Sequence, residues 1–333
     1  MTLRRPAPVS ALLALAAVAC ATAPAPAAGR ATTENFVVDA PTKELARTFG
    51  EAAEKFRKEK ALDWLGKEMP PWPARCPLVV EVTPDQAGGA TEFTFGPVAG
   101  GRMGVTAQQM RIFGDVPRLL VSVLPHEVTH TVFAYRFGQA VPRWADEGGS
   151  VLSENDDERY KHDVKCRELM SRGRCINLNV LFRMKEYPQD THTLYAQGYS
   201  VCRYLIDRGG GGLAGRRKFL DFIGVGLRND NRNWAEAAQV YGYDSPDDLQ
   251  LDWIEAMRKT VPQRAGRTPP AGGAVALTGG KGTETRNSFA GLPLLEPPLT
   301  ARGATPGTER TTVAAPSLPP PLRLLPPEVP ARR

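Results

Sequence analysis

Residues 124–149 constrain the fold of this 333-residue chain more strongly than any other stretch. They include the pentapeptide His126-Glu127-Val128-Thr129-His130, which follows an apolar segment and therefore predicts a buried helix. Because residues four apart lie on one face of a helix, the two imidazoles can face one metal ion. Glu127 is rotated by about 100° from His126, so its carboxylate would lie beside the ion, where a base for a bound water is needed.

A third ligand has to come from outside this helix, and the chain turns back to supply one. Gly138 suits the C-cap of the first helix, and Pro142 suits the start of a second helix. Glu147 follows about one turn later, so two antiparallel helices would bring its carboxylate to the histidines. We therefore predict that His126, His130 and Glu147 bind Zn2+, which favours two imidazoles and a carboxylate. In the alternative interpretation, the helix is amphipathic and its histidines face solvent.

A third segment, residues 195–205, reads Tyr-Ala-Gln-Gly-Tyr-Ser-Val-Cys-Arg-Tyr-Leu. With the pentapeptide and the Pro-Arg-Trp-Ala-Asp-Glu-Gly-Gly of residues 142–149, it resembles the gluzincin branch of zinc metallopeptidases, the peptidase MA-like families that include aminopeptidase N and thermolysin. The resemblance spans residues 116–206 and implies a zinc-activated water with Glu127 as its general base. It also implies that Tyr195 donates a hydrogen bond to the oxyanion of the tetrahedral intermediate. The competing candidates for that role are Tyr187, His192 and Tyr199.

Exopeptidase members of that family carry a Gly-x-Met-x-Asn strand, which this sequence lacks. The segment Gly101-Arg102-Met103-Gly104-Val105 matches it only in part, so the resemblance implies zinc-dependent hydrolysis rather than aminopeptidase specificity. We predict a metallopeptidase that hydrolyses peptide bonds in peptide or protein substrates. Two alternatives are a catalytically inactive relative that binds envelope peptides or glycans, and a structural envelope protein in which the pentapeptide is accidental.

The charge distribution gives no support for nucleic-acid binding. The net charge of +6 divides into +3 for residues 1–30, −2 for residues 31–261 and +5 for residues 262–333. The part that is expected to fold is therefore slightly acidic, whereas a nucleic-acid interface needs a basic patch.

Residues 1–30 are predicted to be an export signal peptide, because Arg4 and Arg5 precede an apolar run and then small residues. The apolar run, Val9–Ala19, is too short to anchor the chain across a bilayer. In an alternative, Ala17-Val18-Ala19-Cys20 is a lipoprotein box, and a lipid on Cys20 attaches the protein to a membrane. Both interpretations predict a protein outside the cytoplasm, either secreted or in the cell envelope.

Four cysteines remain besides Cys20, and an even number in an exported protein favours disulfides over thiol chemistry. Cys166 and Cys175 lie close in sequence and could close a small loop, which would leave Cys76 with Cys202. Four cysteines allow three pairings, and the sequence does not choose among them. No Cys-x-x-Cys pair is present, which argues against a zinc site made of cysteines.

The hydrophobic periodicity predicts an α+β fold, with a small N-terminal sheet packed on a mainly helical, zincin-like catalytic domain over residues 31–261. An edge strand that lines the cleft is expected within residues 91–106. Fourteen prolines and few aromatic residues predict that residues 262–333 are a disordered tail. The other expected elements are a helix at 42–67, strands at 77–83, 91–95 and 101–106, and helices at 219–224, 234–241 and 249–257.

Three further residues near the predicted site have two or more interpretations. Glu154, seven residues after Glu147, could accept a hydrogen bond from the outer N–H of a ligand imidazole, or it could be a solvated carboxylate. His162 is predicted to lie on the surface, because charged residues surround it in the sequence. Gly198, about one turn after Tyr195, is predicted to leave room for the backbone of a substrate.

Overall fold

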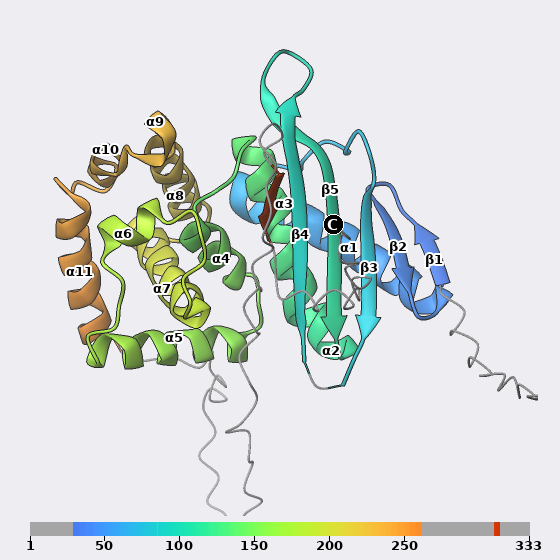
Figure 1. Ribbon diagram of the computed structural model, residues 1–333, viewed down its shortest axis with the longest axis horizontal. Helices are drawn as coiled ribbons and strands as arrows, with labels where there is room; N and C mark the ends of the chain where they lie inside the picture. The colour runs from blue at the N-terminus through green and yellow to red at the C-terminus, as the bar shows by residue number, and fades with distance from the viewer. Residues whose placement is uncertain (1–28, 85, 261–309, 314–333) are drawn as a thin grey trace, which may run out of the picture.

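The computed structural model describes residues 29–84 and 86–260, together with the backbone of residues 310–313. A sheet forms the N-terminal part and helices form the part that follows, and the two lie side by side (Figure 1). The predicted α+β class is thereby confirmed. The predicted signal peptide lies outside the described residues up to residue 28, and so does the predicted tail apart from residues 310–313.

Within the described residues, six strands form one mixed sheet in the order β1-β2-β3-β5-β4-β6. Strand β3 pairs in parallel with both β2 and β5, whereas the other neighbours are antiparallel. The three predicted strands correspond to β3, β4 and β5, of which β5 is longer than expected, and the sequence analysis missed β1 and β2. The bounds are Gly29–Thr32 (β1), Phe36–Ala40 (β2), Cys76–Val82 (β3), Gly88–Pro97 (β4), Met103–Gly114 (β5) and Arg310–Val313 (β6).

Helix α1, Lys43–Leu65, packs across β1 and β2 and confirms the helix predicted at 42–67. It begins where the Thr42 side chain accepts a hydrogen bond of 3.1 Å from the backbone N–H of Leu45. Its apolar side, with Phe49 at the centre, forms one cluster with alternate residues of β2 and β3 such as Val38 and Leu78. The alternation follows from the period of two along a strand.

The central helix of the site belongs to a helical run that starts at Val116. Helix α2 (Val116–Arg118) and a π-helical turn, η1 (Leu119–Val123), lead directly into α3 (Leu124–Phe137). Helix α3 contacts α1 as well as β4 and β5. Gly138 ends α3 with a φ of 63°, and a Cβ there would lie 2.3 Å from the carbonyl oxygen of Met103. The predicted C-cap is confirmed, and the position requires glycine.

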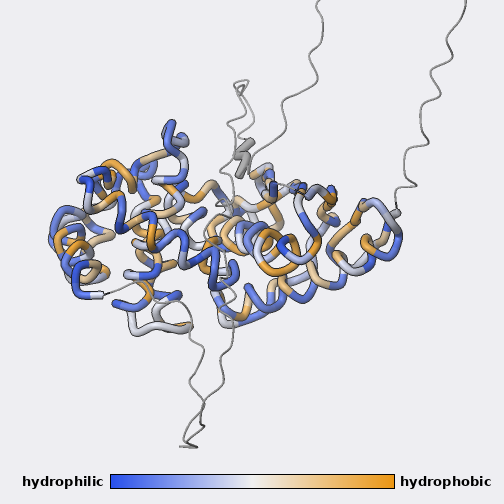
Figure 2. The backbone as a smooth tube through the Cα atoms, turned by 90° about the horizontal axis from the view of Figure 1, so that it is seen from below, coloured by the Kyte–Doolittle hydropathy of each residue, from blue (hydrophilic) through white to orange (hydrophobic). Residues whose placement is uncertain are grey.

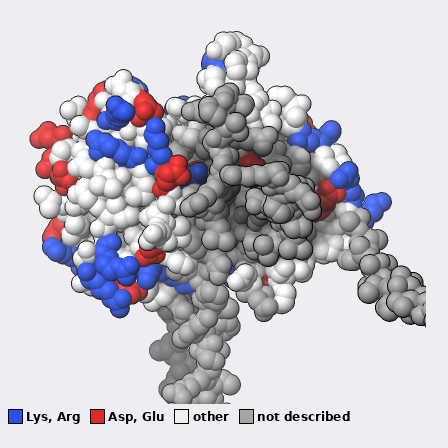
Figure 3. All heavy atoms as spheres, in the orientation of Figure 1, with Lys and Arg blue, Asp and Glu red and all other residues white. Residues whose placement is uncertain are grey.

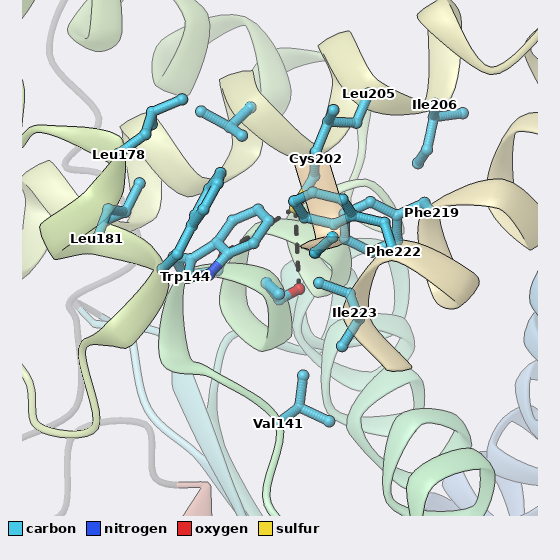
Figure 4. Close-up of a cluster of buried hydrophobic side chains, with 14 of the residues drawn as sticks. Val141, Trp144, Leu178, Leu181, Cys202, Leu205, Ile206, Phe219, Phe222 and Ile223 are labelled. Atoms are coloured by element: carbon cyan, nitrogen blue, oxygen red, sulfur yellow. Dashed lines mark hydrogen bonds between the residues drawn. The ribbon is translucent and has the colours of Figure 1, made fainter. Parts of the chain in front are cut away.

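The helical part is built around α7 (Thr191–Arg208), which contacts α4, α5 and α8. Figure 4 shows its apolar core, which includes Trp144 and Phe222. The ring of Trp144 also packs on that of Phe182, with 4.7 Å between centroids. In Figure 2, hydrophilic (blue) and hydrophobic (orange) stretches alternate along the helices, as expected for amphipathic helices. The three predicted C-terminal helices are confirmed as α8, α10 and α11. The remaining bounds are α4 Arg143–Val151, α5 Asp156–Ser171, α6 Leu178–Arg183, α8 Gly212–Gly226, α9 Arg228–Asn231, α10 Trp234–Gln239 and α11 Pro246–Lys259.

The four cysteines that the structure describes are free thiols, so the predicted disulfides are wrong. Cys76 lies in the apolar cluster of the sheet and Cys202 in that of the helical part, which keeps the predicted second pair apart. Cys166 and Cys175 do contact each other, and this contact raises the pKa of the Cys166 thiol. The even number of cysteines therefore did not show whether they lie close enough to form disulfides.

The surface of the helical part carries both signs of charge. On the face in Figure 3, Lys and Arg alternate with Asp and Glu in small groups. Ion pairs in the helical part include that of Arg172, at the end of α5, with Glu168 at 2.8 Å. No helix among the residues described is long and apolar enough to cross a membrane.

Candidate metal centre

The pentapeptide lies in the first half of α3, where the helical part covers it. The exposed fractions of His126, Glu127 and His130 are 5%, 2% and 2%. One ligand atom from each of the three lies within 4.8 Å of the others, so this buried group could hold a metal ion. The alternative in which the histidines face solvent is excluded.

Helix α4 brings a second carboxylate, Glu147, to this group. Its Oε2 lies 3.4 Å from Nε2 of His126 and 3.8 Å from Nε2 of His130. This oxygen is buried and makes no hydrogen bond of normal geometry. Buried oxygens rarely lack a partner, and a cation placed between the three atoms would satisfy all of them.

Carboxylates hold the outer nitrogens of both imidazoles. Nδ1 of His126 lies 2.7 Å from Oε1 of Glu154, and Nδ1 of His130 lies 2.8 Å from Oδ1 of Asp146. Because an ionised carboxylate only accepts hydrogen bonds, each Nδ1 carries a proton, and each Nε2 can offer its lone pair to an ion. Glu154 therefore follows the first of its two predicted interpretations, while the role of Asp146 was not found in the sequence.

The electrostatics favour a cation at the same point. Burial lowers the pKa of His126, but the neighbouring carboxylates of Glu147 and Glu154 outweigh burial and raise that pKa well above its ordinary value. Burial also raises the pKa of Glu147, but contacts with His126 and His130 outweigh it and bring that pKa to about 2. In the metal-free protein, a proton on the imidazole thus neutralises the buried carboxylate, as a metal ion would.

Glu127 faces the sheet rather than α4. Oγ1 of Thr91 in β4 donates a hydrogen bond of 2.7 Å to Oε2 of Glu127. A Cβ at Gly89 of the same strand would lie 2.6 Å from Oε1 of Glu127, so glycine leaves the space that the carboxylate fills. Burial raises the pKa of Glu127, which suits a group that has to take up and release a proton. Strand β4, Gly88–Pro97, overlaps the range 91–106 in which an edge strand was predicted, although β6 lies outside it in the sheet.

Tyr195 of α7 lies beside the histidine pair. Its ring stacks on that of His126, with 6.3 Å between centroids and 13° between planes. Burial and the charge of Glu147 raise the pKa of its hydroxyl well above the ordinary value, so the hydroxyl keeps the proton that it would donate. Tyr199 faces away from the pair, and its hydroxyl accepts a hydrogen bond of 3.4 Å from Arg203.

Tyr187 is a partner of Glu147 that the sequence analysis missed, because it considered this tyrosine only for the oxyanion. The hydroxyl of Tyr187 donates a hydrogen bond to Oε1 of Glu147. The guanidinium of Arg143 lies over the ring of Tyr187, 4.7 Å from its centre. Tyr187 belongs to the connection between α6 and α7, and no residue spacing in that connection marks it.

Two glycines allow α4 and α7 to cross at backbone contact. A Cβ at Gly148 would lie 2.3 Å from the carbonyl carbon of Gly198, and a Cβ at Gly198 would lie 2.5 Å from the carbonyl oxygen of Trp144. The prediction that Gly198 leaves room for a substrate is therefore wrong, since it makes room for α4. The thiol of Cys202 lies 3.9 Å from the same carbonyl oxygen of Trp144, and Figure 4 labels both residues. These contacts fix the helix that carries Glu147.

The prediction that His162 lies on the surface is wrong, because only 1% of the residue is exposed. Helix α5 packs along α7, and His162 lies on the covered side. The charges next to it in the sequence did not indicate which side of α5 packs. His192, at the start of α7, is partly exposed.

A groove of about 890 Å³ lies apart from these residues, at the C-terminal end of α3. Side chains from several elements line it, among them Trp72, Tyr135 and Arg217. None of the candidate ligands or catalytic residues belongs to its lining, so the groove is not part of the centre.

The arrangement thus places a candidate ion site, a buried carboxylate beside it and a protonated hydroxyl within one region. Together, a metal ion and a carboxylate can activate a water, and a hydroxyl can stabilise the negative charge that develops. No protein-family model matches this chain, and no curated protein matches it either.

Proposed function

We propose that this protein is an exported, zinc-dependent metallopeptidase. The observation that carries the proposal is the convergence of two Nε2 atoms on Oε2 of Glu147, with each imidazole held from behind by a carboxylate. Two imidazoles and one carboxylate are a usual ligand set for catalytic zinc, and a fourth position remains for water. Outer carboxylates of this kind fix the tautomer and orientation of ligand histidines.

We assign the third ligand to Glu147 and the general base to Glu127. Oε2 of Glu147 faces both histidines and has no hydrogen-bond partner, whereas Oε2 of Glu127 accepts the hydroxyl proton of Thr91. Asp146 is a poorer candidate ligand, because its carboxylate is bound to the outer nitrogen of His130.

When bound, zinc supplies a water whose pKa lies near neutrality. Glu127 would accept a proton from the attacking water and would then donate it to the leaving amine of the substrate. The hydroxyl of Tyr195 donates a hydrogen bond to the oxyanion, where a donor placed in advance gives most of its benefit in the transition state. Tyr187 holds the carboxylate of Glu147 in place.

An extended peptide substrate would pair with the outer edge of β4, next to Thr91 and Glu127. Support comes from the backbone of Arg310–Val313, which takes this edge as an antiparallel strand opposite residues 91–94. Addition of a strand to a sheet edge is a common way to bind a peptide, because the main-chain hydrogen bonds do not depend on sequence.

The export proposal depends on the sequence of residues 1–30. Mass spectrometry of the mature N-terminus separates its two forms. An N-terminus within the alanine-rich segment indicates secretion, whereas a lipidated Cys20 indicates attachment to a membrane.

The test of the peptidase proposal is cleavage of a peptide library by the purified protein and by Glu127→Gln. Gln keeps the shape of the side chain but cannot accept the proton, so the variant should retain its metal and lose about 10²–10⁴-fold in turnover. Glu81→Gln, in β3 and paired with Arg111, is the matched control and should cleave like the wild type. Equal turnover in Glu127→Gln would refute the mechanism, and a wild type that binds zinc without cleaving any peptide would favour the inactive relative.

A further inference from the structure

A buried histidine behind the site makes no hydrogen bond. Both ring nitrogens of His162 lack a partner, although only 1% of the residue is exposed. Burial lowers the pKa of His162 to about 3, so the ring is neutral near neutral pH and carries one N–H and one lone pair. Buried polar atoms without partners are rare in folded proteins, and one next to a candidate active site calls for an explanation.

The neighbours of His162 are residues of the proposed centre. The Tyr195 ring lies between two imidazoles, with its centroid 6.3 Å from that of His126 and 6.3 Å from that of His162. The planes of Tyr195 and His162 differ by 22°. The centroid of the His162 ring also lies 6.1 Å from that of Tyr199, so the imidazole neighbours two tyrosines of α7.

The second neighbour is Glu154, whose two oxygens have different surroundings. Oε1 binds Nδ1 of His126 at 2.7 Å, whereas Oε2 has no hydrogen-bond partner. Nε2 of His162 lies 4.0 Å from that free Oε2. A bridging water with two hydrogen bonds of about 2.8 Å at a tetrahedral angle would span about 4.5 Å between the two atoms, while a shift of about 1 Å gives a direct hydrogen bond.

We propose that His162 is a positioning residue, which supports the Tyr195 ring from behind and fixes Glu154 through its free oxygen. His162 thus acts on the centre through two residues, the oxyanion donor and the carboxylate that orients His126. The inference rests on the proposed function, since Tyr195 and His126 have these roles only there. His162 itself touches neither substrate nor metal.

Two substitutions separate the nitrogens of His162 from the space that its ring fills. His162→Phe keeps a flat ring beside the tyrosines but removes both nitrogens, and it should fold with a melting temperature close to that of the wild type because the ring contacts with Tyr195 and Tyr199 are kept. This variant should bind zinc about 10-fold more weakly and have about 10-fold lower kcat with KM unchanged. His162→Gln carries an N–H near the position of Nε2, so its zinc affinity and its kcat should both remain within about threefold of the wild-type values.

His192→Phe is the matched control, because His192 is a partly exposed histidine at the start of the same helix α7. It should leave zinc affinity and kcat unchanged. The proposal is overturned if His162→Phe equals the wild type in both measurements, or if His162→Gln loses as much as His162→Phe, since the ring would then only fill space. Zinc affinity is measured on metal-free protein without substrate, so a protein that binds zinc but cleaves no peptide would refute the peptidase function and leave this test intact.

Discussion

The sheet and the helical part contribute to the candidate site in different ways. The sheet reaches it through β4, where Gly89 and Thr91 surround Glu127. The helical part supplies the carboxylates around the histidines, which include Asp146 and Glu147. The two sides of α3 therefore have separate tasks in the proposed function. The side that faces the sheet holds the base, and the side that faces the helices holds the ion.

The two cores differ in the same way. Beside the apolar cluster beneath the sheet, the protein buries Asn35 and Arg57. Between α4, α5 and α7 the protein also buries Glu158, His162 and Asp163. Buried charges are costly unless they are paired, and Glu158 is paired with Arg118 at 3.1 Å. We infer that the buried carboxylates of the helical part serve to orient the ligands, so substitutions of the carboxylates beside the histidines should change metal binding, while substitutions in β4 should change turnover alone.

The largest effect is expected for Glu147→Ala, on the helical side. This variant should lose most of its zinc and all measurable cleavage, because the carboxylate that faces both Nε2 atoms is removed. Metal content after dialysis is the measurement. A variant that keeps its zinc would mean that another carboxylate is the third ligand, with Glu127 the nearest candidate.

Tyr195→Phe should lower kcat by about 10²–10³-fold with little change in KM, since the lost donor acts only in the transition state. Its matched control is Tyr199→Phe, one turn along α7, which should stay within several-fold of the wild type because that hydroxyl is turned to Arg203. Steady-state kinetics of both variants decide between the tyrosines. The reverse order of effects would assign the oxyanion to Tyr199.

Asp146→Ala should weaken zinc binding by about 10–100-fold, because Asp146 orients His130 without being a ligand. Titration of the metal-free variant with zinc gives the affinity. At saturating zinc the variant should still hold one ion, which distinguishes it from Glu147→Ala. Complete loss of binding would place Asp146 among the ligands.

Thr91→Val tests the sheet side of the comparison. The hydroxyl of Thr91 binds only the base, so kcat should fall by about 5–10-fold while zinc affinity stays constant. Thr94→Val in the same strand is the control and should change neither quantity. A drop in zinc affinity for Thr91→Val would show that the two sides of α3 are not independent.

The last prediction concerns the oxidation state of the cysteines and involves no change in activity. Cys76 and Cys202 belong to different clusters, so each should titrate as a free thiol once the protein is unfolded without reductant. Cys166 and Cys175 touch and are the pair that oxidation can join. Thiol counting should find at least two thiols, and a count of zero would contradict this separation.

Sequence reasoning succeeded where a motif fixes local geometry. The spacing of the pentapeptide, the glycine at position 138 and the apolar periodicity of residues 42–67 each depend on the helix period, and α3 and α1 follow from them. Strand β4 was found because alternation marks a half-buried strand.

The outer partners of the ligands could not be predicted in the same way. Tyr187 lies in an irregular connection, and Asp146 neighbours a better candidate, so neither has a spacing that marks it. His162 and Gly198 were misplaced because their surroundings depend on how α5 and α4 pack on α7. One signal was available: Glu158, His162 and Cys166 follow one another at intervals of four residues within α5, as members of one buried side would.

The metal content of the purified wild-type protein, with Glu127→Gln alongside, tests the assignment of the centre most directly. We expect one zinc ion per chain in both proteins, because the base is not a ligand and its replacement leaves His126, His130 and Glu147 in place. A wild type that binds no zinc after the ion is supplied, or a Glu127→Gln variant that loses it, would contradict this assignment.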